Sequence, residues 1–238
     1  MAERLVFREV VGAADPMFRQ AYALLQRVFP PSELVPAADL LRTLREGAAG
    51  VWTDLHWHMV IAERGDRTLG VATGTYFGSL NIGTIGYLAI RARSRSAGLG
   101  PKLRSRLRRA FDQDARRLGR EGVEALIGEV EPDNPWLRRL VRHHHAIPLD
   151  LPYFQPPVRP AEPEVPLVLY YQPLRRVRKR VPVAEVRRIL YAIWRRGYRI
   201  ASPLEDARFR RMLRTLNGRK SVGTRALPAA RARGPLHE

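Results

Sequence analysis

The sequence predicts a mixed α/β (α+β) domain with a mostly antiparallel central sheet flanked by helices, followed by a basic helical C-terminal extension. Three observations lead to this prediction. Apolar segments of strand length alternate with amphipathic segments of helical spacing through residues 1–172. A short glycine turn at 64–67 joins two of the strands, as antiparallel pairing permits. After Pro173 the strand signals stop, and the composition becomes strongly basic.

The first half of the domain alternates short apolar segments with turn residues. Leu5 to Val11 alternates in polarity as a strand does. Pro16 suits the first position of a helix that Pro30 ends. The remaining predicted elements of this half are a helix at 37–45 and strands at 57–63, 68–76 and 84–90.

A glycine-bearing turn connects the strand at 84–90 to an amphipathic helix that starts near Pro101. Two glycines without Cβ atoms let backbone N–H groups approach an anion, and a helix N-terminus adds unpaired donors and partial positive charge. Pro101 suits the first helical position, where no N–H is needed. We interpret the turn as a pyrophosphate cradle. It comprises Arg95, Ser96, Ala97, Gly98, Leu99, Gly100, Pro101 and Lys102.

Three other interpretations of the turn are a dinucleotide-binding fingerprint, a P-loop and a plain connection. A dinucleotide-binding fingerprint needs a third glycine, which is absent at the required offset. A P-loop needs a glycine followed by Lys and Ser or Thr, and the sequence holds no such run. A turn that merely joins a strand to a helix stays open, because short glycine motifs are weakly specific.

The segment after the turn predicts a helix, a strand and a second helix. The helix carries an apolar stripe, which consists of Leu103, Leu107, Ala110, Phe111, Ala115 and Leu118. A buried strand at 123–130 and a helix at 135–144 follow, with the string Glu129-Val130-x-x-x-Asn134 between them. Two further strands are predicted at about 149–154 and 166–172.

The pattern Arg-x-x-Gly-x-Gly, after a strand and before a long helix, resembles the acyl-CoA loop of the GNAT acetyltransferase superfamily. The string from Glu129 to Asn134 resembles the same region of the bacterial N-terminal acetyltransferases of ribosomal proteins. The resemblance covers about residues 1–172. It implies a GNAT-like fold and an acyl-CoA-dependent N-acyltransferase. The implied donor is acetyl-CoA, and the implied acceptor is a primary amine of a small molecule or peptide.

The resemblance also implies roles for individual residues. Glu129 corresponds to the general base, and Asn134 to the residue that contacts the cofactor arm. The strand before the cradle supplies backbone N–H groups that polarise the thioester carbonyl. These groups would come from Leu88, Ala89 and Ile90.

Two assignments of the proton-transfer residues stay open. Glu131 is a second candidate base, because strand alternation would place it on the same face as Glu129. The relatives protonate the departing thiolate with a tyrosine in their last helix, where this chain has Val141. Tyr153 is the candidate for that role here.

The formal charge of +19 is concentrated near the C-terminus. Residues 175–238 hold 19 Lys+Arg and four acids. One interpretation is a surface for nucleic acid or another polyanion, such as an anionic membrane surface. The other is arginine-rich coding bias, because only three of the 42 cations are lysine. A GNAT-like module that has lost catalysis and binds a polyanion through 175–238 is therefore the alternative function.

The organisation predicted is a GNAT domain at 1–172 and a partly helical extension at 173–238, with a mobile tail from about residue 218. No apolar leader and no apolar run of about 18 residues occur, so a cytoplasmic protein is expected. A homo-oligomer is compatible with the sequence.

No metal site is predicted. The chain has no cysteine. His143, His144 and His145 point in different directions on a helix and cannot converge on one ion. His56 and His58 share a strand face, which fits either a partly exposed strand or a substrate pocket.

Overall fold

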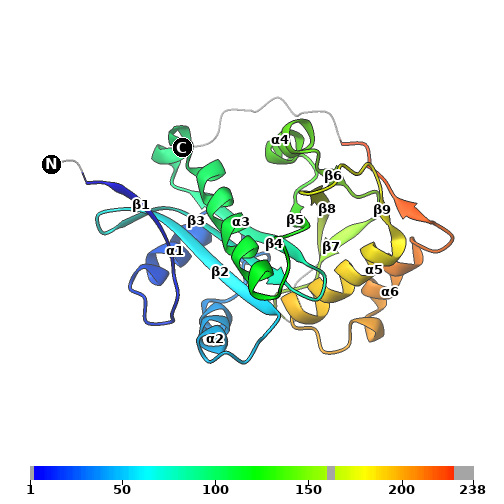
Figure 1. Ribbon diagram of the computed structural model, residues 1–238, viewed down its shortest axis with the longest axis horizontal. Helices are drawn as coiled ribbons and strands as arrows, with labels where there is room; N and C mark the ends of the chain where they lie inside the picture. The colour runs from blue at the N-terminus through cyan, green and yellow to red at the C-terminus, as the bar shows by residue number, and fades with distance from the viewer. Residues whose placement is uncertain (1–2, 160–163, 228–238) are drawn as a thin grey trace. The chain divides into compact units, whose positions relative to one another are not determined.

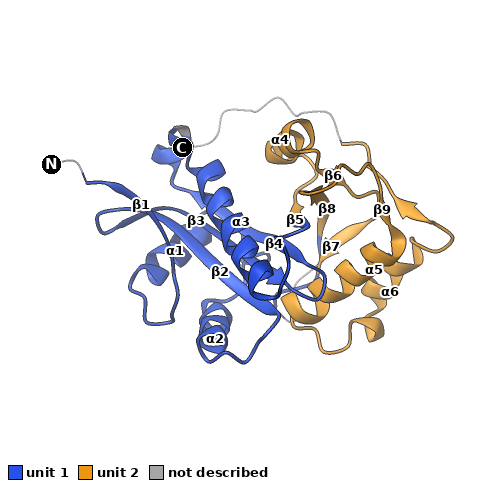
Figure 2. Cartoon of the chain, viewed as in Figure 1, with its two compact units in different colours: residues 1–127, 156–165 blue, residues 128–155, 166–238 orange. Residues whose placement is uncertain are grey.

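Residues 3–159 and 164–227 are described by the computed structural model, which divides into two units (Figure 1, Figure 2). The first unit comprises Met1–Ile127 and Pro156–Val165, and the second comprises Gly128–Gln155 and Pro166–Glu238. The predicted boundary divides the chain once, after residue 172. In the structure each unit consists of two separate stretches of the chain. The second unit therefore contains both the region around Glu129 and the C-terminal extension.

The first unit is built on antiparallel strands in the order β1-β2-β3-β4. Their bounds are β1 Leu5–Glu9, β2 Leu55–Arg64, β3 Arg67–Phe77 and β4 Ile82–Ile90. The turn between β2 and β3 is the predicted one, with Arg64 paired to Arg67. Gly65 has φ 56° there, a left-handed conformation that glycine adopts without a Cβ clash.

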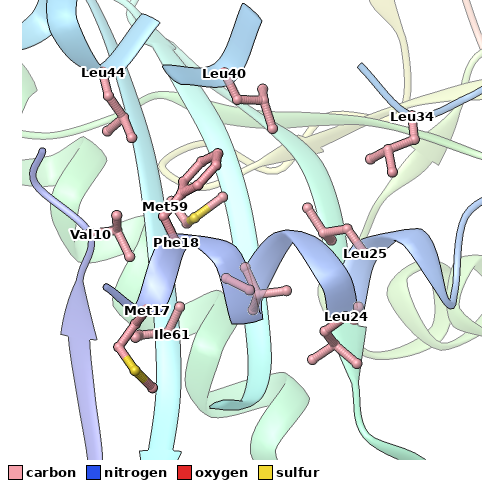
Figure 3. Packing of buried hydrophobic residues seen from close by; sticks show 13 residues of the cluster. Val10, Met17, Phe18, Leu24, Leu25, Leu34, Leu40, Leu44, Met59 and Ile61 are labelled. Atoms are coloured by element: carbon pink, nitrogen blue, oxygen red, sulfur yellow. The ribbon is translucent and has the colours of Figure 1, made fainter. Parts of the chain in front are cut away.

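Helices cover both faces of this sheet because side chains alternate across each strand. Met59 and Ile61 of β2 pack with α1 (Met17–Gln26) and α2 (Ala37–Ala48) in an apolar cluster (Figure 3). The long helix α3 (Leu99–Arg117) packs on the other face. A Cβ on Gly74 or Gly83 would overlap the Phe111 side chain of α3, so these glycines let the helix approach the sheet closely.

Within its described residues, the second unit combines several strands with three α-helices. Its strands are the end of β5 (Ala125–Val130), β6 (Ile147–Pro148), β7 (Tyr153–Gln155), β8 (Val165–Pro173), β9 (Val181–Pro182) and β10 (Ser221–Val222). The strands β6 and β8 pair antiparallel, as do β9 and β10. The helices are α4 (Pro135–His144), α5 (Val183–Ala192) and α6 (Ala207–Arg214). The predicted fold class, a mostly antiparallel sheet flanked by helices with a basic helical extension, is confirmed.

The C-terminal extension packs into the second unit. The ring of Trp194 lies 5.8 Å from that of Phe154 and 4.9 Å from that of Phe209, between centroids. Trp194 and Phe209 are fully buried. Residues 218–227, assigned from sequence to the tail, contain β10, and Arg180 donates to the Ser221 Oγ over 2.7 Å. Residues 228–238 lie outside the described ranges. Across those ranges, no helix has the length and apolarity to cross a membrane.

Candidate active site

The turn that we interpret as a pyrophosphate cradle lies in the first unit, between β4 and α3. A short 3₁₀ segment, η1 (Ala92–Ala97), follows β4 and carries Arg95 in its last turn. Gly98 then has φ 65°, so a side chain at this position would be strained. At Gly100 a Cβ would meet the Ile90 Cδ1 at 3.3 Å, so α3 packs closely on the end of β4 at this glycine.

The helix α3 starts two residues earlier than predicted. Leu99 is its first residue, so Pro101 is the third and not the first. The proline still costs nothing, because N–H groups of the first turn have no intrahelical acceptor. Arg95 and Lys102 are exposed there, and the first turn carries no acid. The turn therefore combines backbone donors, the positive helix end and two cations, which suits an anion.

The end of β4 carries the backbone predicted to polarise a thioester. Leu88 and Ala89 pair with Ala72 and Val71 of β3. The register shifts just before this pair, and the N–H of Tyr87 donates to the Thr73 Oγ1 over 2.9 Å. A bulge of this kind re-aims a strand locally. The role of Leu88, Ala89 and Ile90 stays a prediction.

Glu129 lies near the end of β5 and is held by two tyrosines of the second unit. The hydroxyl of Tyr153, on β7, donates to the Glu129 Oε1, and the hydroxyl of Tyr198 donates to the Oε2. Burial raises the pKa of Glu129 above its ordinary value of 4.5, and the two tyrosine hydrogen bonds act in the opposite direction. Both oxygens of one carboxylate are thus fixed by donors from distant segments.

Tyr153 keeps its phenolic proton at neutral pH. It is 2% exposed. Burial raises the pKa of its phenol well above 10, and the neighbouring charge of Glu129 raises it further. The two candidates for proton transfer that came from the sequence, Glu129 and Tyr153, are therefore in direct contact.

The other predicted residues lie in different settings. Glu131 is exposed and follows the last residue of β5, so strand alternation does not place it beside Glu129. Asn134 caps α4, with its Oδ1 accepting from the Trp136 N–H over 3.0 Å. Val141 packs against the apolar cluster around Leu137. The contact of Asn134 with a cofactor arm stays a prediction.

Sequence reasoning missed Tyr198, which lies 69 residues from Glu129. Nothing in its local pattern marks it, because a single aromatic residue in a basic segment is common. The setting of His58 was also missed. His58 is buried, and its Nδ1 and Nε2 each lie 2.6 Å from a carboxylate oxygen, of Glu9 and Asp114 respectively. Asp114 lies on the apolar stripe of α3. A carboxylate at such a position indicates a buried partner, and this was the signal in the sequence that could have pointed to His58.

The sequence predicts that His143, His144 and His145 do not form a metal site. These three residues are exposed at the end of α4, and His145 has φ 52°. Among residues 3–159 and 164–227, no group of three or more His, Asp or Glu side chains is arranged to hold a metal ion.

Comparison with known proteins gives matches of structure only. No protein-family model matches the sequence, and no curated protein matches it. A protein of Bacteroides thetaiotaomicron assigned to the GNAT acetyltransferases superposes with a TM-score of 0.56 at 19% identity, covering 82% of this chain and 99% of that one.

Two further solved structures are similar over a smaller share of the chain. The ribosomal-protein-S18-alanine N-acetyltransferase of Escherichia coli matches with a TM-score of 0.46 at 16% identity, over 74% of this chain and 97% of that one. The yncA protein of Salmonella typhimurium, assigned as an acetyltransferase and solved with acetyl-CoA, matches with a TM-score of 0.47 at 18% identity, over 73% and 95%. The Bacteroides structure carries the conclusion, which is that this chain has the fold of the GNAT acetyltransferases.

Proposed function

We propose that this chain is an acyl-CoA-dependent N-acyltransferase that transfers acetyl from acetyl-CoA to a primary amine. The observation that carries the proposal is the contact of Glu129 with Tyr153. From the family resemblance, Glu129 is the candidate base, and Tyr153 is the candidate acid because the relatives' tyrosine position is Val141 here. Their hydrogen bond supports a proton-transfer pair in a chain that has the GNAT fold.

In this proposal Glu129 accepts a proton from the amine, because only the neutral amine attacks a thioester. Tyr153 gives its phenolic proton to the departing sulfur and recovers one from Glu129 through their hydrogen bond. The amine nitrogen gains the acyl carbon, the sulfur gains a proton, and Glu129 ends as the carboxylate and Tyr153 as the neutral phenol with which they began. Both residues return to their starting state after each turnover.

The donor supplies an activated thioester, and its pyrophosphate fits the turn before α3. The N–H groups of Leu99 and Gly100, with the side chains of Arg95 and Lys102, would hold the phosphates. Ser96, Ala97, Gly98 and Pro101 shape this turn in the proposal. The N–H groups at the end of β4 and the side chain of Asn134 would contact the thioester and the pantetheine arm.

Calorimetric titration with acetyl-CoA tests the cradle. We expect micromolar binding that weakens with dephospho-CoA, which lacks the 3′-phosphate. Arg95→Ala should weaken acetyl-CoA binding about tenfold, because a charge-assisted contact to phosphate is lost. Arg109→Ala is the matched control, since Arg109 is an exposed arginine near the middle of α3, away from the turn. Equal affinity of both variants for acetyl-CoA would refute the assigned cradle.

A second candidate function is polyanion binding by the loop between β8 and β9. Residues 175–180 hold five Lys+Arg and no acid, and Val177 in their midst is 81% exposed. Arg178 pairs with Glu185 over 2.6 Å, which shows that part of this charge is used within the unit. The remaining exposed cations of the loop suit phosphates of a nucleic acid.

Titration with a short duplex DNA at several salt concentrations tests this second function. We expect affinity that falls linearly with salt on logarithmic scales, and a further loss in the double variant Arg176→Glu/Lys179→Glu. The matched control is Arg139→Glu/Arg142→Glu, which reverses two exposed charges on α4. Binding that the two double variants weaken equally would reflect net charge alone and would contradict a site at 175–180.

A further inference from the structure

The chain between α5 and α6 has an irregular backbone that delivers Tyr198 to Glu129. Residues Ile193–Gly197 form a π-helical turn, η2, in which the N–H of Tyr198 donates to the Ile193 carbonyl over 2.8 Å. Arg199 then has φ 59°, a left-handed conformation that is uncommon for a residue with a side chain. The π turns are rare and are frequent at functional sites, where they re-aim one side chain.

This segment contacts Glu129, the base of the proposed proton-transfer pair. The hydroxyl of Tyr198 donates to the Glu129 Oε2, opposite the bond from Tyr153 to the Oε1. Trp194, inside the π turn, is fully buried between the rings of Phe154 and Phe209. The contact of Tyr198 with Glu129 therefore comes from an anchored element.

We infer that Tyr198 is a positioning residue for the Glu129 carboxylate, so that the C-terminal segment 183–200 is part of the acyl-transfer site and not only a separate binding module. The inference rests on the proposed function. With Tyr153 on one oxygen and Tyr198 on the other, the carboxylate cannot rotate, and its remaining lone pairs point in a fixed direction. A donor on each oxygen also keeps the carboxylate in the charged form that a base needs.

The variant Tyr198→Phe removes one hydroxyl and keeps the ring. Loss of the hydrogen bond should raise the pKa of Glu129 further, because a donor to the charged form is gone. The acid limb of kcat/KM should therefore move to higher pH. At pH values below the acid limb, we expect about tenfold less turnover in Tyr198→Phe than in wild type. At pH values above the limb, turnover should be near that of wild type, and the dissociation constant for acetyl-CoA should be unchanged.

The matched control is Tyr191→Phe, which makes the same change on α5, at an exposed position. It should leave the pH profile unchanged. A uniform loss of turnover at every pH in Tyr198→Phe would indicate a structural role and would overturn the inference. If Tyr198→Phe does not fold, difluorotyrosine at position 198 replaces it. Its more acidic phenol is a stronger donor, so the acid limb should move to lower pH, and no movement would overturn the inference.

Titration of the Glu129 carboxyl by ¹³C NMR separates this inference from the proposed function. Glu129→Gln identifies the resonance by its disappearance. If no amine is acetylated by the wild type, the proposed function fails, but the NMR titration still reports on Tyr198. A Glu129 pKa that is equal in wild type and Tyr198→Phe would overturn the inference whatever the turnover.

Discussion

Replacement of Glu129 by Gln is expected to lower turnover by about 10²- to 10⁴-fold, the usual contribution of a general base, while acetyl-CoA affinity stays at the wild-type value. The amide keeps the size of the carboxylate and can still accept a hydrogen bond from Tyr153, but it cannot take a proton from an amine. Steady-state kinetics with an amine found by screening, together with calorimetry, separate these two effects.

The pH profile of the wild type is part of the same prediction. Because burial raises the pKa of Glu129 above 4.5, the acid limb of kcat/KM should lie above the ordinary range of a carboxylic acid. Turnover is then lost as the pH falls and the base becomes protonated. In Glu129→Gln this limb should disappear, because the titrating group is gone.

Glu131→Gln is the control for this experiment, since it makes the same change two residues away at an exposed position. It should leave both turnover and the acid limb unchanged. A loss in Glu131→Gln that equals the loss in Glu129→Gln would contradict the assignment of the base. Retained turnover in Glu129→Gln across the pH series would remove Glu129 from the mechanism.

Capping residues, prolines and turn glycines predicted those helices and turns whose bounds depend on neighbouring residues alone. The helix at 135–144 has the predicted bounds because Asn134 caps it and Pro135 suits its first position. The turn at 64–67 follows from Gly65, which adopts a left-handed conformation there. The start of α3 was wrong by two residues, because a proline is tolerated anywhere in the first turn.

Contacts between distant segments could not be predicted from one sequence. The bond from Tyr198 to Glu129 spans 69 residues, and those from His58 to Glu9 and Asp114 span 49 and 56. No local pattern encodes such pairings, because they depend on how whole elements pack. The same limit explains Glu131, whose predicted position assumed that β5 continues past Val130.

Replacement of Asp114 by Asn is expected to lower the free energy of unfolding of the first unit by about 3 kcal/mol near pH 6.5, because it breaks a buried ion pair. Asp114 is 0% exposed and lies 2.6 Å from the His58 Nε2. Burial alone lowers the pKa of His58, but the hydrogen bonds to Asp114 and Glu9 outweigh it and raise the pKa to about 9. The imidazole is therefore charged at neutral pH.

The sign of the pH dependence follows from this raised pKa. A group whose pKa is higher in the folded state stabilises that state fully below its unfolded pKa of about 6.5. The contribution is lost as the pH rises through about 9. A shift of the His58 pKa from 6.5 to about 9 corresponds to about 3 kcal/mol. The free energy of unfolding of the wild type should therefore fall by about this much as the pH rises from 6.5 to above 9. Asp114→Asn should lose much less over the same window, and the two stabilities should converge near pH 10.

Urea unfolding at pH values from 6 to 10 measures this convergence. Asp112→Asn is the matched control on the same helix, where the carboxylate is only half-buried and lies 3.7 Å from Arg108. It should cost about 1 kcal/mol or less, at every pH in the window. A constant difference between wild type and Asp114→Asn from pH 6 to 10 would mean that His58 is neutral in the folded protein. Convergence of the two stabilities would instead mean that His58 carries a proton, and because Glu9, His58 and Asp114 belong to β1, β2 and α3, that proton links the sheet to the helix that begins at the proposed cradle.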